Sequence, residues 1–133
     1  MSHLRPSTFL RRALILDAAA SGATGLLMIA GAGLLEGLLG VPAQLMRGAG
    51  LVLVPYVVFV AWLGTRETLT RGAVWAVIVC NAVWAAASFL LLAEGWIAPN
   101  LLGYVFIVGQ ALVVALFGEL QYIGLRRPMA AAA

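Results

Sequence analysis

Asp17 stands out in this chain, because it lies inside an apolar stretch that follows a pair of arginines, Arg11 and Arg12. At about 100° per residue, Ser21 and Thr24 fall within about 40° of Asp17 on the same helical face. A carboxylate beside two hydroxyl groups can bind a proton or a cation, or can accept hydrogen bonds from neighbouring helices. The spacing therefore predicts a polar stripe along one face of the first helix.

Later apolar stretches also carry isolated polar side chains, at Tyr56, Asn81 and Gln110, and Trp84 lies one turn beyond Asn81. At about 1.5 Å rise per residue, these groups and Thr24 lie at similar depths, roughly 12–22 Å from one end of their helices. One interpretation is interhelical hydrogen bonding, which contributes about 0.6 kcal/mol per bond in membranes. The other is a small ligand site with an aromatic wall. Under either interpretation, the candidate residues are Ser21, Thr24, Tyr56, Asn81, Trp84 and Gln110.

Three charged residues form a second candidate group: Asp17, Glu119 and Arg71. Asp17 and Glu119 each lie a few residues inside the nearest arginines. Their possible roles are proton or cation coupling, an interfacial ion pair with an arginine, or a contact between subunits. Glu119 is about 180° from Gln110, so we expect it to face outward if Gln110 faces the interior.

The residue types also argue against several kinds of site. The single histidine, His3, lies in the N-terminal tail, and the single cysteine, Cys80, lies inside an apolar stretch. Two histidines for a haem, a histidine-rich metal site and an intramolecular disulfide are all excluded for one chain. We see no nucleophile–base pair either. The sequence predicts a non-enzymatic protein without catalytic residues, metal or cofactor.

The composition indicates that this chain folds in a lipid bilayer. Hydrophobic residues make up 64% and charged residues 10% of the 133 residues, whereas soluble domains carry about 25% charged residues. Residues 18–35, 48–64, 72–93 and 95–118 contain no charged side chain. Each stretch is close to the roughly 20 residues that a helix needs to cross a bilayer. Apolar and polar side chains do not alternate along these stretches, as they would in the strands of a membrane β-barrel.

These stretches predict an all-α fold, an antiparallel bundle of four transmembrane helices that forms a single integral membrane domain over residues 1–133. We expect helices at roughly 13–36, 43–64, 72–94 and 99–125. The short connection between the second and third predicts that they are neighbours. Pro55 should kink the second helix.

The arginines predict the orientation of the bundle. All eight basic residues are arginines, and only Arg47 falls in an outer loop; the other seven lie at the two ends and in the loop after the second helix. By the positive-inside rule, both termini are cytoplasmic, and the net charge of +3 reflects orientation and not nucleic-acid binding. A cleaved signal peptide would also explain the basic start, but the apolar run is long and contains Asp17, so we expect an uncleaved first helix.

A faint repeat suggests two related helical hairpins. Arg12 precedes the Glu-Gly pair at 36–37 by 24 residues, and Arg71 precedes the Glu-Gly pair at 94–95 by 23 residues. An axis along the membrane normal would relate such hairpins, as in some transporters. The alternative is that any two outer turns favour glycine and proline.

The segments "LDAAASGATGLL", "GLVLVPYVVFVAW", "AVWAVIVCNAVW" and "GELQYIGLRR" resemble a group of small bacterial four-span inner-membrane proteins that are mostly uncharacterised. The resemblance covers nearly the whole chain. It implies the four-helix fold and a location in the bacterial inner membrane, and it supplies no catalytic or binding residues.

Two functional hypotheses follow. The first is an accessory or interaction subunit, favoured by short loops and by small residues spaced for close helix packing. The alternative is a small proton-coupled carrier of a small or hydrophobic solute, which would use Asp17 and the polar-aromatic cluster. The expected partners are the lipid bilayer and a second copy or a larger membrane complex.

Overall fold

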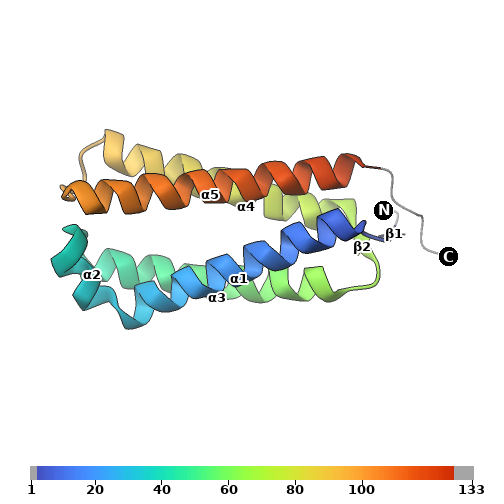
Figure 1. The fold of residues 1–133 in the computed structure, drawn as a ribbon, viewed down its shortest axis with the longest axis horizontal. Coiled ribbons are helices and arrows are strands. Elements are labelled where there is room, and N and C mark those ends of the chain that lie inside the picture. Colours follow the sequence, from blue (N-terminus) through green and yellow to red (C-terminus); the bar gives the residue numbers. More distant parts are fainter. Residues whose placement is uncertain (1–2, 128–133) are drawn as a thin grey trace.

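The structure, a computed structural model, describes residues 3–127. This part of the chain forms five helices, α1 (Thr8–Ala30), α2 (Ala32–Leu39), α3 (Ala43–Thr65), α4 (Arg71–Ala93) and α5 (Leu101–Arg126). The two-residue strands β1 (His3–Leu4) and β2 (Leu69–Thr70) pair antiparallel. The four long helices lie side by side along the long axis, with α2 at one end (Figure 1). The prediction of an all-α fold with four long apolar helices is confirmed.

All four long helices are sufficiently long and apolar to cross a membrane. Many of their outward-facing side chains are large and apolar; Leu26 is 68% exposed and Leu101 is 79% exposed. A soluble monomer rarely exposes apolar surface on this scale. The fold is therefore compatible with a small membrane protein.

Polar side chains determine where several helices begin. The Ser7 hydroxyl accepts a hydrogen bond from the Leu10 amide at 3.1 Å, so α1 begins at Thr8 and not at residue 13 as expected. The hydroxyl of Thr70 and the amide oxygen of Asn100 cap α4 and α5 in the same way. Such caps satisfy amides that have no partner in the first helical turn. The expectation for α1 relied on the apolar pattern, which starts only after the arginines.

The first predicted helix, 13–36, is wrong as a single element, because the chain turns at Gly31 between α1 and α2. Gly31 has φ −101° and ψ 13°, outside helical geometry. A Cβ atom there would lie 2.8 Å from the Leu27 carbonyl oxygen, so only glycine fits without a shift. The break lets α2 turn and pack against α3 and α5.

The long helices pack closely as two pairs, α1 with α3 and α4 with α5, and α1 also contacts α5. Although the connection between α3 and α4 is short, these two helices are not closely packed. The two helices lie beside each other, as the short connection predicted, and Tyr56 on α3 contacts Asn81 on α4. An apolar slot, described below, lies between most of their length.

Two apolar clusters fill the interior, one around Leu14 and Leu63 and the other around Met28 and Leu53. Tyr56 packs against both clusters. The polar groups near Tyr56 are therefore enclosed by apolar packing toward both ends of the molecule.

Gly50 allows the close approach of α1 and α3, and we expect Gly50→Ala to weaken this pair. A Cβ atom at Gly50 would lie 2.8 Å from Ile29 Cγ1 and 2.9 Å from the Gly25 carbonyl oxygen. Overpacking of this kind costs about 1–3 kcal/mol. The measurement is the free energy of unfolding in mixed micelles. Gly48→Ala is the control, because a Cβ atom at Gly48 meets open space; equal effects of the two substitutions would contradict the close-approach role.

Candidate functional site

The side chain of Asp17 is the centre of a buried hydrogen-bond network. Asp17 is 0% exposed. Its Oδ1 accepts a hydrogen bond from the Ser21 hydroxyl at 2.9 Å. Its Oδ2 lies 2.7 Å from the Tyr56 hydroxyl, 2.7 Å from Gln121 Nε2 and 3.1 Å from Asn81 Nδ2. The carboxyl group thus contacts polar side chains from α1, α3, α4 and α5.

The partners of Asp17 also contact one another. Asn81 Nδ2 donates to Gln121 Oε1 at 2.8 Å, and the Tyr56 hydroxyl lies 2.9 Å from Asn81 Oδ1. We call these five residues, Asp17, Ser21, Tyr56, Asn81 and Gln121, the Asp17 network. Within residues 3–127, no buried side-chain nitrogen or oxygen lacks a hydrogen-bond partner. This matters because an unpaired polar group in an apolar interior is costly.

Gln121 reaches the network from α5, on the helical face that packs against α4. Gly118 on α5 faces Asn81 on α4, because a Cβ atom at Gly118 would lie 3.4 Å from Asn81 Cβ, an ordinary van der Waals distance. Gln121 follows Gly118 by one turn and is fully buried. The amide of Gln121 can therefore reach across to α1.

Two arginines at the same end of the bundle as Asp17, Arg11 and Arg71, bind backbone carbonyl groups. Arg11 donates to the carbonyl oxygens of Gly64 and Arg66, at 2.6 and 2.8 Å, and Arg71 donates to the Leu125 carbonyl at 3.3 Å. These carbonyls lie at the C-terminal ends of α3 and α5, where cations are favoured. The four partners of Asp17 are all neutral. These contacts give no support to the ion pair with an arginine that was one interpretation of Asp17.

A second group of hydrogen bonds joins α4 and α5 further from the arginine-rich end. Trp84 Nε1 donates to Gln110 Oε1 at 2.7 Å, and Gln110 Nε2 donates to the Ser88 hydroxyl at 3.0 Å. Thr24 donates to the Ala20 carbonyl of its own helix at 2.8 Å. Thr24 is therefore bonded locally and not to another helix.

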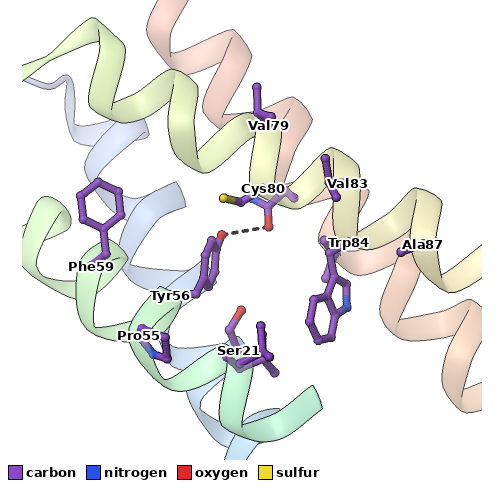
Figure 2. A pocket seen from close by; sticks show the side chains of 13 residues that line it. Ser21, Pro55, Tyr56, Phe59, Val79, Cys80, Val83, Trp84 and Ala87 are labelled. Carbon is purple, nitrogen blue, oxygen red and sulfur yellow. Dashed lines mark hydrogen bonds between the residues drawn. The ribbon is translucent and has the colours of Figure 1, made fainter. Parts of the chain in front are cut away.

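A cavity of about 580 Å³ separates α3 from α4, and we call it the slot. Its α3 wall includes Pro55 and Phe59, and its α4 wall includes Val83 and Trp84. In Figure 2 the Tyr56 hydroxyl points from α3 toward α4, where a dashed line joins it to Asn81. Among the lining residues, the polar groups of Ser21, Tyr56 and Asn81 belong to the Asp17 network. The slot is thus apolar along its walls and reaches this network at its floor.

The slot opens on the apolar surface of the molecule. Val52 on α3 and Val79 and Val83 on α4 all line it, and they are 62%, 53% and 61% exposed. A molecule dissolved in lipid could enter between α3 and α4 without crossing a charged surface.

A smaller cavity of about 160 Å³ adjoins the slot on the α5 side. Ser21 and Trp84 border both cavities, and Thr24 and Gln110 border only the smaller one. The six residues of the candidate ligand site therefore line two adjoining cavities. Ser21, Tyr56 and Asn81 belong to the Asp17 network, and Trp84 and Gln110 belong to the second group of hydrogen bonds. Thr24 belongs to neither.

Comparisons with protein-family models, with curated proteins and with solved structures give no match to this chain. The assignment of function therefore depends on the geometry of the slot and of the Asp17 network.

The remaining sequence candidates lie outside the network. Glu119 is exposed on α5, on the side away from Gln110, as its spacing suggested. Gln121, which was not among the candidates, is a member of the network. Its spacing of eleven residues from Gln110 places both on one helical face, and this signal could have identified it. Within the described part of the chain, no three His, Cys, Asp or Glu side chains gather as metal ligands would.

Proposed function

We propose that this chain is a small integral membrane protein that takes up a hydrophobic solute from the lipid phase and binds it in the slot, as the binding step of a carrier. The solute class is an uncharged, mostly apolar molecule with one hydrogen-bonding group at its end. No catalytic step is assigned to the site.

The slot is the observation that carries this proposal. Its volume of about 580 Å³ lies within the range of roughly 300–1,000 Å³ that is typical of small-molecule sites. Apolar walls with a few convergent polar groups are also typical of such sites. Tyr56 and Asn81 supply those polar groups at the floor, where a hydroxyl or carbonyl end of the solute would bind.

The membrane arrangement that we propose is an antiparallel bundle with both termini in the cytoplasm, in the inner membrane of a bacterium. The distribution of basic and aromatic side chains supports it. The guanidinium of Arg66 lies 5.1 Å from the Trp62 ring centre, and that of Arg126 lies 5.7 Å from the Tyr122 ring centre. These pairs occur at the end where α3 and α5 finish, and arginine with aromatic residues is typical of a cytoplasmic interface.

An accessory subunit is the second candidate function, and the exposure of α4 favours it. Only 17% of the most apolar 18-residue stretch of α4 is buried, against 39% for α1. A partner helix would have room to pack there. Some of the small residues that suggested this role pack within the chain and not against a partner, since Gly25 and Gly50 lie where α1 and α3 approach each other closely.

Alkylation of Cys80 tests solute binding directly, because it is the only cysteine of the chain and it lines the slot. We expect farnesol, an apolar alcohol, to slow the reaction of Cys80 with a lipid-soluble maleimide in the detergent-solubilised full-length protein. The saturated hydrocarbon farnesane lacks the hydroxyl group and should protect less. The measurement is the alkylation rate by mass spectrometry as farnesol is titrated.

A cysteine outside the slot provides the control. Leu116 is 51% exposed on α5 and borders none of the cavities described above. In a Cys80→Ala background, farnesol should leave the alkylation rate of Leu116→Cys unchanged. Equal protection at both positions, or none at Cys80, would refute the slot as a farnesol site. A stoichiometric protein that copurifies with the chain would then favour the accessory role.

A further inference from the structure

The oxygen–oxygen contacts of Tyr56 require one proton more than an ionised Asp17 network contains. The Tyr56 hydroxyl lies 2.7 Å from Asp17 Oδ2 and 2.9 Å from Asn81 Oδ1. Both contacts have hydrogen-bond length, yet a phenol has one proton to donate. If Asp17 were a carboxylate, one of these two contacts would hold oxygen lone pairs facing each other with no hydrogen between them.

Exchanging the nitrogen and oxygen positions of the amides does not remove this deficit. With Asn81 exchanged, its oxygen would face Asp17 Oδ2 and Gln121 Oε1, which are both oxygens. With Gln121 exchanged as well, its oxygen would also face Asp17 Oδ2. The orientation that best satisfies the donors keeps both amide nitrogens on Asp17 and leaves Asn81 Oδ1 facing Tyr56.

The charges around Asp17 lead to the same conclusion. The groups that face it are Ser21 on α1, Tyr56 on α3, Asn81 on α4 and Gln121 on α5. None of them is a cation, and the nearby Arg11 and Arg71 bind carbonyl groups. A fully buried carboxylate without a cation is costly in an apolar interior. The neutral acid avoids this cost.

We infer that Asp17 is a proton-binding site and is the neutral acid in this structure. The carboxylic O–H at Oδ2 donates to the Tyr56 oxygen, and the Tyr56 O–H donates to Asn81 Oδ1. Every short contact then contains a hydrogen atom. Asp17 is the only aspartate of the chain, and the four glutamates are exposed.

Proton release from Asp17 is coupled to solute binding in the slot; this coupling rests on the proposed function. When Asp17 loses its proton to water, the Tyr56 hydroxyl turns its single hydrogen toward the carboxylate. The lone pair of Asn81 Oδ1 that accepted the Tyr56 hydrogen is then free, and it can accept a hydrogen bond from the hydroxyl end of a solute. Solute binding and proton release are therefore coupled, with one proton released for each alcohol bound.

Infrared spectroscopy tests the proton site without any assumption about the solute. We expect the purified full-length protein near neutral pH to show the carbonyl stretch of a protonated carboxylic acid. Aspartate labelled with heavy carbon at its carboxyl group should shift this band, and that measurement needs no variant to fold. Asp17→Asn should remove the band, and Glu119→Gln, which replaces an exposed acid, should leave it in place.

Farnesol then tests the coupling. We expect it to reduce the band in the wild type. Its affinity should rise with pH by at most about tenfold per pH unit, the limit for one released proton. The Asp17→Asn variant should show no such pH dependence, because an amide does not ionise.

The outcomes separate the two proposals. Absence of the labelled band would overturn the proton site even if farnesol protects Cys80. A labelled band without protection of Cys80 would support the proton site and refute the proposed solute. A band that farnesol leaves unchanged, although Cys80 is protected, would overturn the coupling.

Discussion

Asp17→Ala should destabilise the fold by about 3 kcal/mol, the largest effect that we expect from truncating one polar side chain. Asp17 makes hydrogen bonds with four polar side chains: Ser21, Asn81 and Gln121 donate to its carboxyl group, and Tyr56 shares a hydrogen bond with its Oδ2. Leaving a buried donor or acceptor unsatisfied costs about 1–3 kcal/mol. The loss is less than four times that figure, because Asn81 keeps its contacts with Tyr56 and Gln121. The free energy of unfolding in mixed micelles, followed by circular dichroism, measures the effect.

Glu119→Ala is the control for this experiment. Glu119 is the acid on α5, and its side chain is exposed. Its truncation should therefore change the free energy of unfolding by less than about 0.5 kcal/mol. Asp17→Asn should cost less than Asp17→Ala, because an amide keeps one acceptor oxygen for the network. If the alanine variant were as stable as the wild type, the network would contribute nothing to the packing of the four helices.

The four apolar helices could be predicted because their signal is strong and local. Stretches of 17 to 24 residues without a charge leave little choice but a spanning helix. The break at Gly31 was missed because glycine is common in tightly packed membrane helices. Only the structure shows that Gly31 interrupts the helix, at a position where a Cβ atom would lie too close to the Leu27 carbonyl oxygen. The early start of α1 depends on one cap at Ser7, which an apolar pattern does not reveal.

Which polar side chains share a site was harder to predict than which of them face the interior. Helical periodicity places Asp17 and Ser21 on one face, and it places Gln110 and Gln121 on another. It does not show how far each helix slides along its neighbour. That relative shift puts Gln121 beside Asp17 and leaves Gln110 with Trp84. Asp17 looked interfacial from its distance to Arg12 along the chain, yet packing from three other helices buries it completely.

Val52→Trp should abolish most farnesol binding. Val52 lines the slot on the α3 side, across from the α4 wall that holds Cys80, and it is 62% exposed. An indole ring at this position would occupy space that the solute needs, without disturbing the buried core. We expect the affinity for farnesol, measured through protection of Cys80, to fall at least about tenfold, which corresponds to about 1.4 kcal/mol.

Val58→Trp is the control that separates blocking of the slot from a general change in the surface of α3. Val58 lies on the same helix with nearly the same exposure, 64%, but it does not line the slot. Its substitution adds the same aromatic side chain to the lipid-facing surface, so it should leave protection of Cys80 unchanged. If both variants lost protection equally, farnesol would act through the surroundings of α3 and not through the slot. If both variants kept the protection of Cys80, farnesol would reach Cys80 by another route, and the slot would not be the farnesol site.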